Sequence, residues 1–435
     1  MELAVFVSKL KGKSLLSGAA MYLFANVVNA AVPFLLLPIL TRYLDPAEYG
    51  KVAMFQTLVA ALAALVGLNV QGAASRKFFD EDAQGEGLRL FIGSCFQVLL
   101  LSSMAVLAVV AVFHDLLSSW LGIPAEWLYL SIGVSVASFI VNMRLGQWQV
   151  RRQAKAYGVL QVTQSLAIML MSIGFVVVLS AGAEGRVWAQ LLAVFCASLI
   201  ACGLLYKDRL VHFLSWRPDY IKEALAFGVP LIPHVVGAFL LFSVDRFVIN
   251  SEFGLEAAGL YMVAVQISLV LGVLFDSVNK AYVPWLFERL SRGDESGSHQ
   301  LIKYSYFYFF LLLSLALLAF WLGPVVVRLF AGEQYAMAGA LIGWLALGQS
   351  FKGMYFTVTG YIFYQKKTSI LSLITIVSGG INFAGLLVGV SLFGLEGAAI
   401  AFAVAMACQF ILSWMFAAKV HPMPWLGVFR RKKMA

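Results

Sequence analysis

The residues best suited to do chemistry in this chain are charged side chains inside, or at the ends of, long apolar segments. Ionisable groups are costly in hydrocarbon, so they usually face the interior of a helix bundle or a watery cavity and pair there. The basic positions of this kind are Arg42, Arg76, Arg144, Arg246, Lys280 and Lys352, and the accompanying amides include Asn26, Asn69 and Asn279. Such a lining suits a hydrated, positively charged cavity and predicts an anionic substrate.

Most of these basic positions also have a structural interpretation. Lys280 follows Asp276 by four residues, so the two could form an ion pair on one helix face and neutralise each other. Lys352 lies near the middle of its segment and is the hardest to explain in this way. The basic residues near segment ends could instead be interfacial anchors that extend towards the lipid headgroups, and these are Arg42, Arg76 and Arg144.

Three further titratable residues are candidates for ion or proton coupling, namely Asp245, Asp276 and His234. His234 could titrate near neutral pH in a proton-coupled cycle, but a lone histidine on a helix is more often a hydrogen-bonded packing residue. Asp245 and Arg246 are sequence neighbours and face different directions on a continuous helix. We therefore expect each of them to find a separate partner on another helix.

Several chemistries are not indicated by the sequence. It contains no phosphate-cradling P-loop, no H-E-x-x-H and no G-x-S-x-G motif. The acidic string from Asp80 to Asp82 is typical of a solvated loop, and the four cysteines lack metal-ligand spacing. We expect no metal, no cofactor and no enzymatic activity. A membrane-embedded glycan polymerase or transferase would need a sizeable catalytic loop, which the short connections do not provide.

The elements that must position these residues are membrane-spanning helices. The 435 residues are 61% hydrophobic and only 12% charged, with a mean hydropathy of +0.88, which is too apolar for a soluble chain. A span of the ~30 Å hydrocarbon layer needs roughly 20 helical residues. Twelve apolar runs of that order predict an all-α polytopic protein, at about 15–40, 50–72, 89–113, 124–146, 157–181, 186–206, 224–250, 257–283, 304–330, 335–364, 369–392 and 395–418.

Charge placement predicts the orientation of these spans. If the N-terminus lies inside, 24 of the 31 Lys and Arg residues fall on the cytoplasmic side, and Arg42, Lys51, Arg186, Arg246 and Arg328 fall outside. Cytoplasmic loops of membrane proteins are enriched in Lys and Arg. Both termini, including the basic tail at 430–433, are therefore expected in the cytoplasm. This topology explains the net charge of +9 without a nucleic-acid partner.

An internal repeat predicts two lobes of six spans each. Gln56 and Asn69 in the second span match Gln266 and Asn279 in the eighth at an offset of 210 residues. Transporters are commonly built from such repeats, with the substrate bound at their interface. We expect an N-terminal lobe over 1–210 and a C-terminal lobe over 211–435. Pairs of prolines in the first and seventh spans are expected bend points, at Pro33, Pro38, Pro230 and Pro233.

Four stretches carry a resemblance to a known family. They are LLPILTRYLDPAEYG at 36–50, VRRQAKAYGVLQ at 150–161, SVDRFVINSEFGLEAAGLYMVAVQIS at 243–268 and INFAGLLVGVSLFGLEGAAIAFAVA at 381–405. The third is the most specific, because its D-R pair, the glycine at 254 and the G-L-Y at 259–261 fall where that family has them. The chain resembles the bacterial lipid-linked oligosaccharide flippases of the superfamily that also contains the multidrug and toxic compound exporters.

The resemblance implies a MATE-like fold of two pseudo-symmetric six-helix lobes around a central cavity. It also implies a flippase that moves polyprenyl-diphosphate-linked oligosaccharides to the outer leaflet of the bacterial inner membrane, by alternating access, for surface polysaccharides such as O-antigen and lipopolysaccharide. The implied partners are this lipid-linked glycan, membrane lipids and other membrane proteins of polysaccharide assembly. An ion-coupled multidrug or metabolite exporter of the same superfamily is the nearest alternative. Such exporters bind cations through acidic residues in the spans, and this chain has few.

Overall fold

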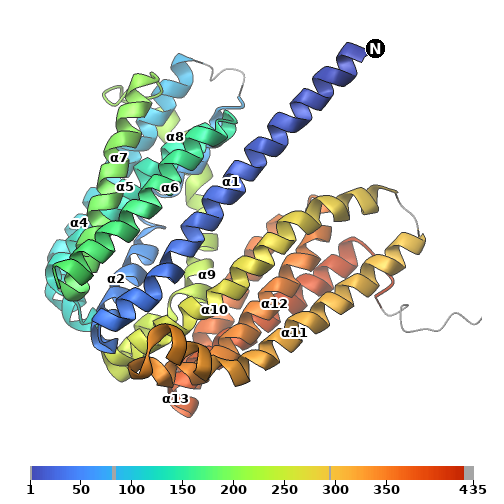
Figure 1. The fold of residues 1–435 in the computed structure, drawn as a ribbon. Coiled ribbons are helices and arrows are strands. Elements are labelled where there is room, and N and C mark those ends of the chain that lie inside the picture. The colour runs from blue at the N-terminus through green and yellow to red at the C-terminus, as the bar shows by residue number, and fades with distance from the viewer. Residues whose placement is uncertain (1, 81–84, 293–294, 426–435) are drawn as a thin grey trace, which may run out of the picture. The chain divides into compact units, whose positions relative to one another are not determined.

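The computed structural model describes residues 2–80, 85–292 and 295–425. Across these ranges the chain consists of helices and short turns, and no β-strand occurs in them (Figure 1). The expected all-α architecture is therefore confirmed. Because every backbone N–H and C=O group in lipid must be satisfied internally, helices are one of only two structures that can span a bilayer.

The chain separates into two compact units, Met1–Val235 and Val236–Ala435. The sequence repeat predicts a division earlier, at residue 210, but α8 packs against α3 and α4 of the first unit. Up to η3 the elements are α1 (Glu2–Tyr43), α2 (Pro46–Leu62), α3 (Val70–Lys77), α4 (Glu86–Leu121), α5 (Ala125–Val150), α6 (Ala154–Ile173), η2 (Gly174–Val178), α7 (Gly182–Lys207), α8 (Pro218–Gly228) and η3 (Val229–Leu231). They are followed by α9 (Ile232–Phe242), α10 (Asp245–Arg292), α11 (Glu295–Ala331), η4 (Glu333–Ala338), α12 (Gly339–Tyr364) and α13 (Ser369–Val420).

Eight helical stretches of the described residues are long and apolar enough to cross a membrane. Two of them, Pro218–Ser291 and Ser369–Val420, are far longer than one crossing needs, and each contains a residue with non-helical backbone angles, Gly254 and Gly394 respectively. Dividing both stretches gives ten crossings. The remaining two expected spans correspond in part to α2, which is short, and to α12, so each of the twelve expected spans overlaps a described helix.

The second expected span, 50–72, is not one continuous helix. α2 ends at Leu62, and Gly67, Leu68 and Asn69 all have positive φ angles before α3 begins at Val70. The neighbouring α4 satisfies part of the freed backbone, since the N–H of Gly67 donates to Ser102 Oγ at 2.9 Å. Irregular backbone at membrane depth is tolerated where protein surrounds it in this way.

The seventh expected span is interrupted at its proline pair. Pro230 lies in the short 3₁₀ segment η3, and Pro233 lies in the first turn of α9. Proline removes a backbone donor and its ring clashes with the preceding turn, so the change from α-helix to 3₁₀-helix occurs where the sequence predicts a bend. Pro33 and Pro38 lie inside α1.

Glycines allow the two halves of α13 to approach closely. At Gly394 the backbone has φ +60°, a conformation that favours glycine. A Cβ atom placed on Gly397 would lie 1.8 Å from the carbonyl oxygen of Gly389. Gly389 belongs to a G-x-x-x-G motif with Gly385, and such motifs permit backbones to come into contact.

Each unit has a central helix that carries a basic residue. In the first unit α5 packs against α2, α3, α4, α6 and α7, and in the second unit α12 packs against α10, α11 and α13. α5 carries Arg144 and α12 carries Lys352. A helix shielded from lipid by its neighbours tolerates basic residues at such positions.

His421, the C-cap residue of α13, gives a prediction about how the stability of the protein depends on pH. His421 Nδ1 lies 2.8 Å from Gln365 Nε2, and burial lowers the pKa of His421 below its ordinary value of 6.5. Folding therefore favours the neutral ring, and this contribution is present above about pH 6.5 and is lost as the pH falls through the lower folded-state pKa. We expect the melting temperature of the purified protein to fall from pH 7.5 to 5.5 by about 2 °C more than that of His421→Gln. Equal losses in both proteins would contradict the prediction.

Candidate functional site

Two lysines and one aspartate come together on the adjacent helices α10 and α12 of the second unit. Lys280 Nζ lies 2.6 Å from Asp276 Oδ2 on α10, which confirms the i,i+4 pair. Lys352, on the adjacent α12, also interacts electrostatically with Asp276. Its ammonium group lies 4.9 Å from the ring centroid of Phe242 and 5.9 Å from that of Phe356. Within the described ranges no carboxylate forms an ion pair with Lys352.

This arrangement leaves an excess of positive charge. One carboxylate, Asp276, can neutralise only one of the two ammonium groups, and the aromatic rings around Lys352 stabilise a cation without neutralising it. The side chains of Lys280 and Asp276 are 48% and 41% exposed, so an incoming group can reach the pair. The cluster can therefore attract an anion.

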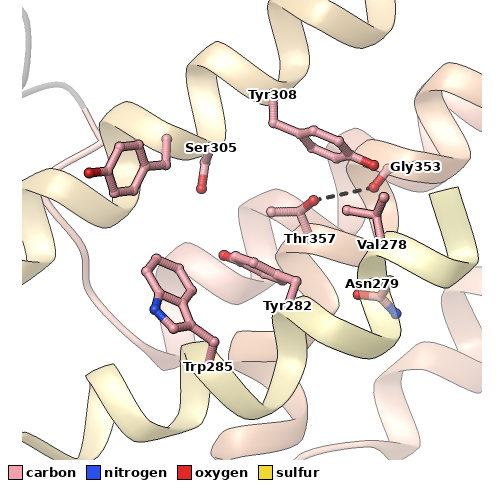
Figure 2. A pocket seen from close by; sticks show the side chains of 9 residues that line it. Val278, Asn279, Tyr282, Trp285, Ser305, Tyr308, Gly353 and Thr357 are labelled. Carbon is pink, nitrogen blue, oxygen red and sulfur yellow. Dashed lines mark hydrogen bonds between the residues drawn. The ribbon is translucent and has the colours of Figure 1, made fainter. Parts of the chain in front are cut away.

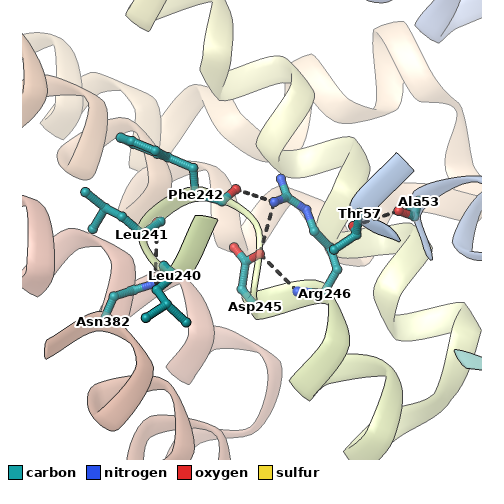
Figure 3. Close-up of polar contacts among 8 residues, drawn as sticks. All are labelled: Ala53, Thr57, Leu240, Leu241, Phe242, Asp245, Arg246 and Asn382. Atoms are coloured by element: carbon teal, nitrogen blue, oxygen red, sulfur yellow. Dashed lines mark hydrogen bonds and ion pairs between the residues drawn. The ribbon is translucent and has the colours of Figure 1, made fainter. Parts of the chain in front are cut away.

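Asp245 and Arg246 bind each other, so the expectation of separate partners is wrong. Arg246 Nη1 lies 3.1 Å from Asp245 Oδ1, and both side chains are buried (Figure 3). The expectation assumed a continuous helix, but α9 ends at Phe242 and α10 begins at Asp245. At this break the Asp245 carboxylate accepts the backbone N–H of Arg246 at 2.9 Å, and the Arg246 guanidinium donates to the carbonyl oxygen of Phe242.

Asn382 on α13 stabilises the same break between α9 and α10. It was not among the candidate residues from the sequence. Its Nδ2 donates to the carbonyl oxygens of Leu240 at 2.8 Å and Leu241 at 3.4 Å (Figure 3). Together with Arg246 it satisfies three carbonyls at the end of α9 that lack helical partners. The available signal was a single asparagine in the apolar run 369–392. Intramembrane amides commonly hydrogen-bond across helices.

Arg144 is buried in the first unit and paired across helices. Its side chain is 2% exposed, and its guanidinium binds the Asp208 carboxylate at the end of α7. The guanidinium also lies 4.3 Å from the ring centroid of Trp148. Arg144 is therefore not an exposed interfacial anchor, and its charge is compensated by a residue 64 positions away.

Arg76 lies beside a cavity of about 380 Å³ formed by α3, α4 and α8. It is exposed, with its guanidinium 5.9 Å from the ring centroid of Phe227. The neighbouring Lys77, which sequence reasoning passed over, binds Glu223 at 2.8 Å and Asp80 at 3.3 Å. The hydrogen bond to Glu223 raises the pKa of Lys77. Of the two basic residues that line this cavity in the described part of the chain, Lys77 forms ion pairs with carboxylates and Arg76 does not. Of the acidic string, Asp80 makes this ion pair, whereas 81–82 lie outside the described residues.

The remaining candidates are dispersed over both units. In the first unit Gln161 donates to Asn26 Oδ1 at 3.2 Å, joining α1 to α6. Asn69 occupies the left-handed position that begins α3, whereas its repeat counterpart Asn279 lies inside α10 and lines a cavity in the second unit. Arg42 is exposed in the last turn of α1. The buried Nδ1 of His234 finds no hydrogen-bond partner among the described residues.

Arg186 is a second basic residue that sequence reasoning passed over as a site. It lies in the first turn of α7 and is 7% exposed. Its Nε and Nη1 atoms form no hydrogen bond within the described part of the chain. The signal was present, since Arg186 is one of the few basic residues on the predicted outer side.

Metal chemistry finds no support in the described residues. Among them no group of three or more His, Cys, Asp or Glu side chains could hold a metal ion. The four cysteines are free thiols. The polar groups described above can bind and orient a charged ligand.

The long apolar helices define a multi-pass membrane protein. The chain matches the polysaccharide biosynthesis protein family over residues 15–290, and it belongs to that family. It is 25% identical over 379 residues to Lsg locus putative protein 1 of Haemophilus influenzae, covering 85% of this chain and 89% of that protein. It is also 25% identical over 356 residues to the succinoglycan biosynthesis transport protein ExoT of Rhizobium meliloti, covering 77% and 65%.

Solved structures confirm the fold expected from the resemblance. The lipid II flippase MurJ, in an inward closed conformation, superposes with a TM-score of 0.73 at 15% identity, covering 93% of this chain and 87% of MurJ. A multidrug resistance MATE family transporter of the MOP superfamily, in an inward-facing conformation, superposes with a TM-score of 0.59 at 19% identity, covering 90% and 94%. At these identities the likeness concerns the fold alone.

Proposed function

We propose that this protein is a flippase that moves polyprenyl-diphosphate-linked oligosaccharides from the cytoplasmic to the outer leaflet of a bacterial inner membrane. The observation that carries the proposal is the excess positive charge of the Lys280, Asp276 and Lys352 cluster on α10 and α12. Membership in the polysaccharide biosynthesis protein family supports it, as does similarity to a transport protein of succinoglycan biosynthesis.

The chemistry of the substrate explains the need for these cations. A diphosphate cannot cross hydrocarbon unaided, because moving uncompensated charge into a low-dielectric medium costs many kcal/mol. Lysine and arginine side chains beside water can replace part of its hydration shell, and arginine can form bidentate contacts with phosphate oxygens. The polar amides contact the glycan, while the polyprenyl chain stays in the bilayer.

The acidic residues within the spans already form ion pairs, which favours an anionic substrate over a cationic drug. The two main in-span acids are Asp245 and Asp276, and both are already paired with basic side chains. A cation exporter would need a carboxylate free to bind its substrate. In this protein each of these carboxylates would first have to give up its own ion pair.

The proposed transport cycle is alternating access between the two lobes. The interruption at η3 and the break between α9 and α10 are bend points at which one half of the span can tilt against the other. The proposed topology places both termini in the cytoplasm. It follows from the distribution of Lys and Arg along the sequence.

Deletion in the native host tests the proposed function. We expect loss of a surface polysaccharide together with intracellular accumulation of its polyprenyl-diphosphate-linked repeat units, because the units continue to be made but are not translocated. Mass spectrometry of extracted lipids measures the accumulation, and a plasmid copy of the protein should reverse it. Unchanged surface glycan with altered drug resistance would overturn the proposal in favour of a drug exporter.

The Lys280 and Asp276 pair gives a second test of the proposed site. Lys280→Ala should reduce complementation of the deletion strain strongly, because it removes a reachable cation and leaves Asp276 to bind Lys352 instead. Asp276→Asn is the matched change, and it should retain more activity since it leaves both ammonium groups in place. The surface glycan formed at equal protein level measures both effects. Full activity of Lys280→Ala would refute a role for this lysine.

A further inference from the structure

A second cavity, of about 330 Å³, lies within the second unit between α10, α11 and α12 (Figure 2). Aromatic side chains dominate its wall, and a few hydroxyl and amide groups interrupt them. The lining residues are Val278, Asn279, Tyr282, Trp285, Tyr304, Ser305, Tyr308, Gly353 and Thr357. Among them only Asn279 is a candidate from the sequence, and Lys280 and Lys352 do not line the cavity.

The shape and chemistry of the cavity suit a hydrocarbon chain. From Val278 to Trp285 it follows α10 for seven residues, or about 10 Å at the rise of an α-helix. Among its few polar groups, the Thr357 hydroxyl already donates to the carbonyl oxygen of Gly353 at 3.3 Å (Figure 2). A slot of this length and polarity accepts part of an extended alkyl chain.

The mouth of the cavity opens on an apolar surface. Val278 is 49% exposed on α10 and Tyr304 is 55% exposed on α11. Phe307 and Leu311 follow Tyr304 at helical spacing and are 68% and 44% exposed. A stripe of large apolar side chains at this spacing, on a helix that crosses the membrane, is covered by lipid. A chain from the bilayer can therefore enter sideways.

Positive charge lies at one end of the cavity. The Arg289 guanidinium lies 5.7 Å from the ring centroid of Trp285, one turn further along α10. Lys303 is exposed and immediately precedes Tyr304, and the rings of Trp285 and Tyr304 lie 6.3 Å apart. A cation beside an aromatic pair at the end of a span, with a second basic residue in the same turn of α11, matches an anionic headgroup at the membrane interface.

We propose that this cavity is a binding site for an anionic phospholipid of the surrounding bilayer. One acyl chain fills the space between Val278 and Tyr308, and the phosphate of the headgroup lies against Arg289. The site is distinct from the proposed diphosphate site and does not depend on what the protein transports. Bound lipid would join α10 to α11 and α12, the helices that carry Lys280 and Lys352.

Native mass spectrometry of the purified full-length protein, titrated with phosphatidylglycerol and with phosphatidylethanolamine, tests the proposal. We expect one tightly bound phosphatidylglycerol in the wild type. Val278→Trp should lower its occupancy about tenfold by filling the cavity mouth, and Leu274→Trp is the matched control. Leu274 lies one turn earlier on α10, is 54% exposed and does not line the cavity. Equal lipid binding by the two tryptophan variants would overturn the proposal.

A second variant keeps the test decisive if Val278→Trp folds poorly. Arg289→Gln removes only a charge near the mouth, so it should reduce the preference for phosphatidylglycerol over phosphatidylethanolamine about tenfold without abolishing lipid binding. Lys367→Gln, an exposed lysine in the turn after α12, is its control. Unchanged preference in Arg289→Gln would contradict the proposed headgroup contact. Displacement of phosphatidylglycerol by an equimolar amount of undecaprenyl phosphate would overturn the choice of occupant and assign the cavity to the polyprenyl chain.

Discussion

Lys352→Ala should abolish complementation of the deletion strain while the amount of protein in the membrane stays unchanged. Lys352 has aromatic rings on two sides and forms no ion pair within the described ranges, so its ammonium group is available to a phosphate. Removing one partner of a desolvated charge contact costs about 2–5 kcal/mol, which corresponds to a loss of transport of about 30-fold or more. The readout is surface glycan per amount of membrane protein.

Two further variants separate a role in transport from a role in packing. Lys352→Arg keeps the positive charge and should retain part of the activity, whereas Lys352→Met keeps most of the side-chain volume and should be inactive. Lys366→Ala, just beyond the end of α12, removes an exposed lysine and should behave as wild type. Normal glycan in Lys352→Ala at normal protein level would show that this lysine is not needed.

Replacing either member of the Asp245 and Arg246 pair should lower the free energy of unfolding more than any other substitution named above. Removing one member of a buried ion pair leaves an uncompensated charge, which costs about 3–5 kcal/mol. Arg246→Leu also removes the hydrogen bond to the carbonyl oxygen of Phe242 at the end of α9. We expect both Asp245→Leu and Arg246→Leu to lower the melting temperature of the detergent-purified protein and its level in the membrane.

The double variant distinguishes the ion pair from a packing effect. Asp245→Leu combined with Arg246→Leu removes both charges, so it should be clearly more stable than Arg246→Leu alone. Asn250→Leu, one turn after Arg246, is a control for replacing a buried polar residue on the same helix. Strictly additive losses would show that the two side chains act independently, contrary to the observed contact.

Much of the fold followed from the sequence because lipid imposes a simple requirement on it. A segment that crosses the hydrocarbon layer must be helical, apolar and about 20 residues long. The predicted spans, the break at Pro230 and Pro233 and the close approach at Gly389 were therefore readable from residue type alone. The break at Gly67 to Asn69 was not, because the contacts that satisfy it come from α4, on a distant part of the chain.

The sequence by itself determined which residues carry charge in the membrane, and only the tertiary structure decided which of those charges are compensated. Arg144 and Lys352 both lie on central helices, and neither has an acidic residue within four positions that could compensate its charge. Arg144 is paired with Asp208, while Lys352 shares Asp276 with Lys280. The physical reason is that neutralisation depends on the distance between groups far apart in sequence, whereas the cost of placing a charge in hydrocarbon is a property of the residue itself.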